Sequence, residues 1–261
     1  TGRFTLDNRF SDALLSYASY SRGYRAGTFN GKASQSDSQV TYVDPEYVDN
    51  YEMGLKSSML DNRLRINSAV FYADYQDQQV QEIVGATSFL RNASGSMRGV
   101  ELELEAYVTD SLYVGANLGY LDSEYDSGEI VNGIDIGGNE FPFAPEVSAS
   151  LFTNWEIMQL GAGTVRFNGV VRYQDQTWFD PFNDRKTKNN GPGKSGQYQD
   201  DYTLVDARLV YQTATYELAL WGRNLTDEFY YVSGFDTSAF LADDLTRGEP
   251  RMYGVEARYN F

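Results

Sequence analysis

Residues 248–261 of the chain read GEPRMYGVEARYNF, and their side chains alternate in character. Small or polar residues separate an apolar set that consists of Tyr253, Val255, Ala257, Tyr259 and Phe261. A period of two places the two sets on opposite faces of a β-strand. In a water-soluble domain such a terminal strand tends to fray, whereas in a membrane-spanning barrel its aromatic residues lie where hydrocarbon meets the polar zone. The stretch predicts a strand with one apolar face, and the rest of the sequence has to distinguish these two settings.

The same alternation recurs along the whole chain, and no helical period of comparable strength is present. It predicts about eleven strands, at residues 2–10, 13–24, 46–57, 63–81, 97–108, 112–124, 145–156, 164–178, 202–212, 215–225 and 250–261. The clearest strand sets Glu101, Glu103 and Glu105 on one face and an aliphatic stripe on the other. We therefore expect an all-β, antiparallel fold.

The predicted connections alternate between short and long. Short ones fall at residues 11–12, 59–62, 109–111, 157–163 and 213–214, and long polar ones at 25–45, 82–96, 125–144, 179–201 and 226–249. A soluble β-sandwich has no reason to place every long loop at one end. A transmembrane β-barrel of the outer membrane has short periplasmic turns and long extracellular loops, with aromatic residues near both ends of its strands. The alternation favours such a barrel over a soluble binding domain.

Composition excludes several classes of function. The net charge of −16 over 261 residues argues against a nucleic-acid partner, because phosphate binding requires a basic surface. The absence of His and Cys removes the commonest bases, nucleophiles and metal ligands, so we expect no enzyme activity, no cofactor and no metal site. The acidic, glycine-rich loop at residues 126–140 resembles a calcium loop in composition but lacks the EF-hand spacing. We find no apolar run of the roughly 18 residues that a membrane-spanning helix needs.

Several short segments resemble a known family. They are WGRNLTD at residues 221–227 followed by Phe229 and Tyr230, EPR at 249–251, VDPEYVDNYEMGLK at 43–56, DNRLRINSAVFY at 61–72, RGVELE at 98–103 and YASYSRGYRAG at 17–27. Together they are similar to the barrel strands and the closing segment of TonB-dependent outer-membrane receptors of Gram-negative bacteria, and the resemblance covers essentially the whole chain.

The resemblance implies a barrel of about 22 strands that surrounds an N-terminal plug. Such receptors import siderophores, cobalamin, haem or oligosaccharides with energy supplied through the TonB complex. Eleven strands are half of such a barrel, so residues 1–261 are expected to be one partial domain, the C-terminal half, without plug or TonB box. Unpaired edge strands in hydrocarbon cost several kcal/mol for each unsatisfied backbone group. We therefore expect partners: an N-terminal half and plug, or another copy or chain, besides lipid and lipopolysaccharide.

The long connection at residues 179–201 is the candidate ligand-binding loop. Cations and aromatic rings together hold anionic, ring-bearing ligands such as a ferric chelate. The candidate residues are Trp178, Phe179, Phe182, Arg185, Lys186, Lys188, Lys194 and Tyr198. The same cations are suited to lipopolysaccharide phosphates or to a solvated loop, and the sequence leaves these alternatives open.

Further candidates lie on the polar faces of the strands. Charged residues expected to face the plug are Glu101, Glu103, Glu105, Arg166, Arg172, Arg208, Arg223 and Arg258, with charge pairing within the wall as the alternative. Tyr259 and Phe261 resemble the signal that the barrel assembly machinery reads in its clients. The function expected is active import of a scarce solute, most readily a ferric siderophore. The alternative is a passive pore or a surface adhesin on a related barrel without a plug.

Overall fold

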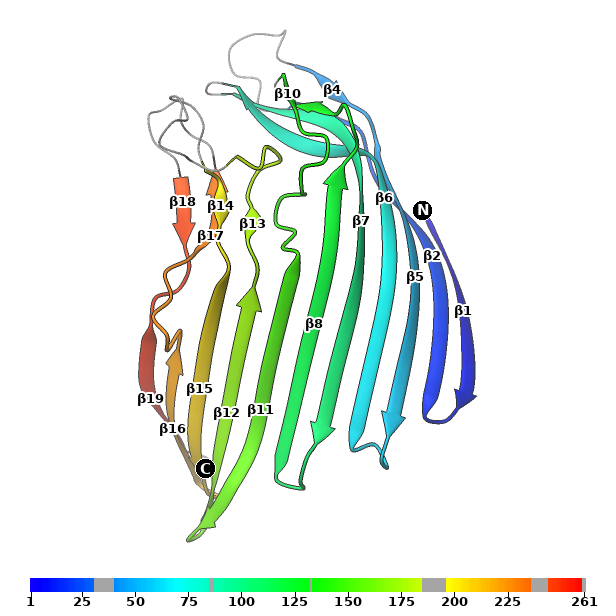
Figure 1. The fold of residues 1–261 in the computed structure, drawn as a ribbon. Helices are drawn as coiled ribbons and strands as arrows, with labels where there is room; N and C mark the ends of the chain where they lie inside the picture. Colours follow the sequence, from blue (N-terminus) through cyan, green and yellow to red (C-terminus); the bar gives the residue numbers. More distant parts are fainter. Residues whose placement is uncertain (31–39, 85–86, 132, 185–195, 236–243, 260–261) are drawn as a thin grey trace.

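The computed structural model describes residues 1–30, 40–84, 87–131, 133–184, 196–235 and 244–259. Its largest element is a sheet of eleven strands (Figure 1), ordered β1-β2-β5-β6-β7-β8-β11-β12-β15-β16-β19. The strands are β1 Gly2–Ser11, β2 Leu14–Arg25, β5 Glu46–Met59, β6 Leu64–Val84, β7 Thr87–Tyr107, β8 Leu112–Tyr125, β11 Val147–Leu160, β12 Gly163–Gln174, β15 Tyr202–Gln212, β16 Tyr216–Arg223 and β19 Met252–Tyr259. The predicted all-β fold and its number of main strands are confirmed.

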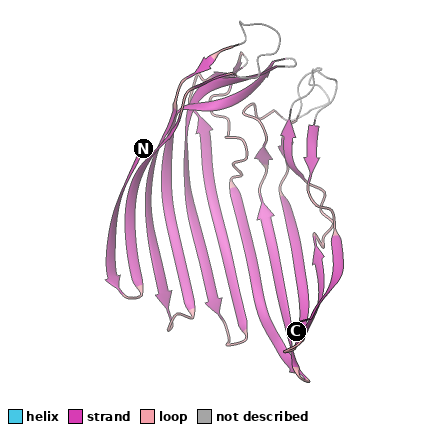
Figure 2. Cartoon of the chain, turned by 180° about the vertical axis from the view of Figure 1, so that it is seen from behind, coloured by secondary structure: helices cyan, strands magenta, loops and turns pink. Residues whose placement is uncertain are grey.

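Strands that are neighbours in this order pair in antiparallel fashion, and the order follows that of the chain. The strands stand side by side as a curved wall, with β1 and β19 at its two edges (Figures 1 and 2). Within the described residues, no helix is long and apolar enough to cross a membrane.

Short turns and long connections lie at opposite ends of the wall (Figure 1). Four of the long connections carry short strand pairs of their own: β3 Thr28–Phe29 with β4 Tyr42–Val43, β9 Ile130–Val131 with β10 Ile134–Asp135, β13 Thr177–Trp178 with β14 Tyr198–Gln199, and β17 Tyr231–Phe235 with β18 Asp244–Arg247. Trp178 therefore belongs to the loop end rather than to β12, which ends at Gln174.

The predicted long loop at residues 82–96 is wrong. β6 and β7 instead continue as one long hairpin that extends past the neighbouring strands (Figure 1). The register shifts between Tyr75 and Gln78, and Asp77 has a φ of 57°, which marks a β-bulge. Bulges bend the strand that contains them. The bend lets Val80 and Ala93 become buried among residues of the following loop.

The two faces of the sheet differ in chemistry. Large apolar side chains stay exposed on one face, for example Leu118 at 47% and Leu151 at 55%. Aromatic residues border this apolar face at both ends. Toward the long loops they are Tyr20, Tyr51, Tyr72 and Tyr120, and toward the short turns they are Trp155, Tyr211, Tyr216 and Tyr259. On β8 the span from Leu112 to Tyr120 is about 27 Å at 3.4 Å per residue. That is close to the roughly 25 Å apolar band of an outer-membrane barrel, so the opposite, polar face is the lumen face.

Candidate ligand-binding loops and lumen wall

The β6–β7 hairpin is attached to the connection between β2 and β5 by side-chain amides. The Asp44 N–H donates to Asn92 Oδ1 (2.8 Å), and Asn92 Nδ2 donates back to the Asp44 carbonyl (3.1 Å). Gln79 Nε2 donates to the carbonyls of Ala26 (2.9 Å) and Asp44 (3.3 Å). These bonds satisfy peptide groups that a turn leaves without a strand partner.

On its other side the hairpin packs against the loop between β8 and β11. The Ser94 N–H donates to Glu129 Oε1 (2.9 Å), and the Asp126 N–H donates to the Ser94 carbonyl (3.0 Å). The ring of Phe141 lies 4.6 Å from that of Tyr125 and 5.7 Å from that of Tyr75. The buried cluster here consists of Val80, Ala93, Tyr125, Val131, Ile136 and Phe141. This loop end therefore has a hydrophobic core of its own.

The aromatic residues of the candidate ligand loop form part of this packing. Trp178 and Phe179 are each only 7% exposed. The Phe179 ring lies 5.4 Å from Phe143, and Trp178 lies 5.5 Å from the half-buried Tyr198. Phe182 packs against the buried cluster. The aromatic half of the candidate site thus offers little surface to a ligand, and its cations, Arg185, Lys186, Lys188 and Lys194, lie outside the described residues.

The loop that follows β12 is joined to its neighbours on both sides. Asn183 Oδ1 accepts from the Glu140 N–H (2.6 Å), and Asn183 Nδ2 donates to the Glu140 carbonyl (3.2 Å). Gln199 Oε1 accepts from the Tyr231 N–H (2.7 Å) in the last long connection. Burial raises the pKa of the Glu140 carboxyl, and the negative charge of Glu146 adds to the rise, while a hydrogen bond from the Trp178 side chain opposes it. Side-chain contacts thus connect all five structures at this end in series.

The arginines expected to face a plug lie on the lumen face, and each is paired within the wall. Arg166 contacts Glu156 (3.7 Å) and Gln212 (2.6 Å), Arg172 pairs with Asp206, Arg208 with Glu217 and Glu256 (both 2.8 Å), Arg223 with Glu249 (3.5 Å), and Arg258 with Glu256 (3.6 Å). These arginines therefore show the charge pairing within the wall that was the alternative prediction. Their contact with a plug stays a prediction.

The three glutamates of β7 also lie on the lumen face but differ in their partners. Glu105 pairs with Arg65 (3.3 Å). Glu103 accepts a hydrogen bond from Asn67 Nδ2 (3.1 Å). In the described part of the chain, Glu101 has neither a hydrogen bond nor an ion pair. No group of three or more acidic residues in the described ranges is arranged to hold a metal ion.

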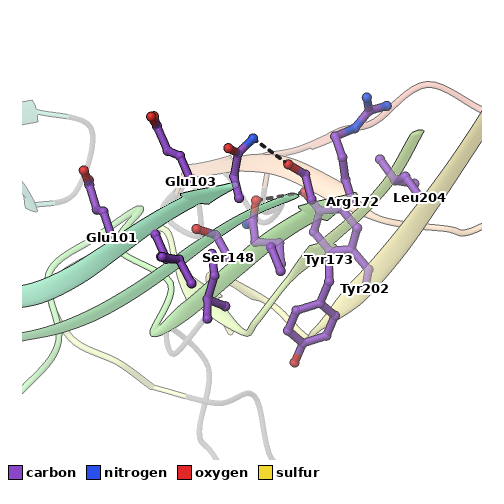
Figure 3. A pocket seen from close by; sticks show the side chains of 14 residues that line it. Glu101, Glu103, Ser148, Arg172, Tyr173, Tyr202 and Leu204 are labelled. Atoms are coloured by element: carbon purple, nitrogen blue, oxygen red, sulfur yellow. Dashed lines mark hydrogen bonds between the residues drawn. The ribbon is translucent and has the colours of Figure 1, made fainter. Parts of the chain in front are cut away.

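A recess of about 440 Å³ opens in the lumen face beside these glutamates (Figure 3). Glu101 and Glu103 stand along one side of it, and Arg172, Tyr202 and Leu204 along the other. Its floor consists of small or short polar residues of β8 and β11, namely Asn117, Gly119, Ser148 and Ser150. Asn117 Nδ2 donates to Ser150 Oγ (3.1 Å), and the Tyr202 hydroxyl donates to Gln174 Oε1 (3.2 Å).

The amides that join the loops were not found from the sequence. Asn224 lies in the WGRNLTD segment, which indicates the family but not the structural role of this side chain. Its Nδ2 donates to the carbonyls of Glu228 (2.8 Å) and Glu249 (3.0 Å), and its φ is 47°. Asn adopts a positive φ more readily than most residues, and this tolerance is the one sequence signal available.

The predicted assembly signal lies at the C-terminal end of β19. Tyr259 pairs with Tyr216 and is exposed, whereas Phe261 lies outside the described residues.

An antiparallel sheet with one exposed apolar face, two aromatic borders and all its long loops at one end is the wall of an outer-membrane β-barrel. The family model of the TonB-dependent receptor-like β-barrel matches residues 1–225. The chain therefore belongs to the TonB-dependent receptor β-barrel family, and its location is the outer membrane of a Gram-negative bacterium.

Among curated proteins, the chain is 27% identical over 243 residues to a probable TonB-dependent siderophore receptor, PiuA, of Acinetobacter baumannii, covering 89% of this chain and 29% of that receptor. It is 25% identical over 237 residues to the ferripyoverdine receptor of Pseudomonas aeruginosa, covering 86% and 26%. It is 24% identical over 242 residues to the ferrichrome outer membrane transporter/phage receptor of Escherichia coli, covering 91% and 29%. The chain thus spans less than a third of the length of these curated relatives.

Solved structures show the same fold. The ferric yersiniabactin uptake receptor FyuA of Yersinia pestis superposes with a TM-score of 0.80 at 20% identity, covering 99% of this chain and 37% of that one. The ferripyoverdine receptor of Pseudomonas aeruginosa bound to ferripyoverdine superposes with a TM-score of 0.71 at 21% identity, covering 99% and 32%. At these identities the likeness shows the barrel fold.

Proposed function

We propose that this chain is the C-terminal half of the barrel of an outer-membrane importer that takes up a ferric siderophore with energy from TonB. The observation that carries the proposal is the family match over residues 1–225 of a sheet whose long loops pack together at one end. The relatives named above supply the solute class, because each name refers to a siderophore or to its ferric complex. The loops present the solute-binding surface, and the lumen face lines the passage.

The test is uptake by the whole receptor in a host strain that lacks its own siderophore receptors. We expect radioactive iron to accumulate from at least one complex in a panel of ferric hydroxamates, catecholates and mixed carboxylates, and accumulation to stop when TonB is deleted. A passive pore, the competing function, predicts uptake that continues without TonB and a steady conductance in planar bilayers. An adhesin predicts neither uptake nor conductance.

The proposal assigns several partners. An N-terminal half-barrel pairs with the edge strands β1 and β19, and a plug occupies the lumen and transmits the TonB contact. The exposed apolar face between the two aromatic borders contacts lipid and lipopolysaccharide. The barrel assembly machinery reads Tyr259 and Phe261, and deletion of Phe261 is expected to lower the amount of receptor in the outer membrane. Normal membrane levels after that deletion contradict this assignment.

The cations of the loop at residues 179–201 are proposed as solute contacts, without the help of Trp178 and Phe179, whose rings are buried. Replacement of Arg185, Lys186, Lys188 and Lys194 by Gln is expected to weaken binding of an anionic ferric chelate. Unchanged affinity assigns these cations to solvent or to lipopolysaccharide. The importer needs no enzymatic step, because energised movement of a plug releases the solute.

A further inference from the structure

Four glycines on the lumen face are each covered by an aromatic ring from the neighbouring strand. A Cβ added to Gly115 would lie 2.1 Å from the Phe152 ring, so that ring occupies the space a side chain would take. Four directly cross-strand pairs share this arrangement: Gly54 with Tyr17, Gly99 with Phe71, Gly115 with Phe152, and Gly254 with Trp221. An aromatic ring over a cross-strand glycine restores packing that the glycine lacks. The wall is therefore filled at these positions.

Gly119 is different, although it lies on the same face of β8 as Gly115. Its cross-strand neighbour is Ser148, and a Cβ built on Gly119 would meet only that serine, with Oγ at 2.9 Å. The next row is formed by Asn117 and Ser150, which bond to each other rather than covering the gap. The recess exists because this part of the wall lacks an aromatic ring such as Phe152, which covers Gly115 two same-face steps nearer the short turns.

The recess has two opposed sides set by the strand register. Glu103, Asn117, Ser150 and Arg172 form one cross-strand row through β7, β8, β11 and β12. Three steps of about 4.8 Å place the backbones of Glu103 and Arg172 about 14 Å apart. The volume of about 440 Å³ is that of a small-molecule site. An elongated small molecule fits in the recess with its long axis across the strands.

The charges on the two sides are unequal. Glu101 is unpaired among the described residues and Glu103 has only the amide of Asn67, whereas Arg172 on the far side is already neutralised by Asp206. Lys56, two strands from Glu103 in the same row, places its ammonium 5.6 Å from the Tyr17 ring centre. The negative side attracts a cation and repels an anion.

We propose that this recess is a lumenal subsite for an elongated polar solute that has a protonated amine or guanidinium at one end. The cation lies at Glu101 and Glu103, and hydroxyl or amide groups along the solute bond to Asn117, Ser150 and Gln174. The inference deepens the proposed import function, since a solute reaches the wall only while crossing the lumen. A plug segment that fills the recess instead is the competing occupant.

The test uses the whole receptor in outer-membrane vesicles. Because residues 1–261 contain no cysteine, Ser148→Cys introduces a selective thiol on the floor of the recess once any cysteine elsewhere is replaced. The probes are a cationic (trimethylammonium) and an anionic (sulfonate) methanethiosulfonate reagent. The rate at which each reagent modifies the cysteine is divided by the rate at which it modifies a free small thiol. Asn154→Cys is the matched control, because Asn154 is on the same strand and face, six residues nearer the short turns.

We expect the cationic reagent to modify Ser148→Cys about 10-fold faster than the anionic one at low salt, and the preference to shrink with added salt. The double change Glu101→Gln and Glu103→Gln should reduce the preference for the cationic reagent at Ser148→Cys to about 2-fold or less. The ratio of the two modification rates at Asn154→Cys should not change. Gly119→Phe, which places a ring across from residue 148, should slow both reagents.

Absence of modification at Ser148→Cys in a folded receptor shows that a plug occupies the recess, and this overturns the subsite. Equal normalised rates for the two reagents, or a preference that survives both Glu→Gln changes, also overturn it. Ser150→Cys serves as a second floor position if Ser148→Cys does not assemble. Modification requires no transport, so failure of the subsite and failure of the import function are separate results.

Discussion

The long-loop end and the membrane-spanning sheet place their apolar side chains in opposite environments. At the loop end, Val131 and Ile136 are fully buried, and side-chain amides satisfy the irregular backbone. In the sheet, Leu118 and Leu151 remain about half exposed on the apolar face. The loop end therefore stabilises itself by burial from water, whereas the sheet relies on its backbone ladder and on lipid. Damage to one region should be measurable apart from damage to the other.

The largest effect expected is from Phe141→Ala, which removes the ring that contacts both Tyr75 and Tyr125. We expect the free energy of opening of the loop end to fall by about 3–5 kcal/mol, as for other buried Phe→Ala changes. Hydrogen exchange of peptides from residues 125–144 measures this, with peptides from residues 112–120 unaffected. Phe143→Ala, at a more exposed ring, is the control with a smaller loss. Equal acceleration in both peptides contradicts the independence of the two regions.

The next effect tests the sheet. Leu118→Arg places a charge within the apolar band and should lower the free energy of unfolding of the receptor in lipid vesicles by about 2–4 kcal/mol. Asn117→Arg, one residue away on the lumen face and opposite Glu103, should change it by less than about 0.5 kcal/mol. Urea titration followed by tryptophan fluorescence measures both. Similar losses for the two variants contradict the assignment of the faces.

A smaller effect is expected from Asn224→Ala. The change removes the buried side chain that donates to the carbonyls of Glu228 and Glu249, at a cost of about 1–3 kcal/mol. Asn154→Ala on the exposed lumen face is the control and should be near neutral. Hydrogen exchange of peptides from residues 224–235 measures the effect. Unchanged protection contradicts the role of Asn224 in joining the last connection.

The smallest effect is a pH dependence of the loop end at Glu140. Its pKa is raised in the folded state by burial and by Glu146, so the folded loop binds a proton more tightly than the unfolded one. The contribution of Glu140 to the stability of the loop end has its full value below the ordinary pKa of a glutamate. It declines as the pH rises through the raised pKa. Hydrogen exchange of the loop across this pH range should show the decline. Glu140→Gln should remove it, and persistence in that variant assigns it to another group.

The sequence predicted the sheet well because a period of two depends only on each strand's own residues. The strand at residues 202–212 is confirmed with both bounds unchanged as β15. The loop end was predicted poorly because its structure depends on partners far apart in the chain. Asn92 and Asp44 are 48 residues apart, and nothing local marks them as partners. The pairing that extends β7 back to Thr87 likewise depends on β6 and on a bulge.

The candidate sites show the same limit. The chemical type of Trp178 and Phe179 suits a ligand site, but type does not reveal that both rings are buried by loop packing. The lumen arginines were placed on the correct face by alternation, whereas their acidic partners became apparent only from the register between strands. The recess was not predicted, because it arises from four small residues on two strands rather than from a motif.

The number of strands in the sheet restricts how this wall can be completed. Ten successive antiparallel steps separate β1 from β19, so the two edge strands point in the same direction. Strands that point the same way are never antiparallel neighbours, so β1 and β19 cannot join each other in a cylinder of this type. A second copy, standing the same way up in the membrane, presents the same two directions and forms no antiparallel seam either. The complementary piece must have an odd number of strands, and both of its outer strands must run opposite to β1 and β19. The wall therefore excludes its own duplicate as a partner.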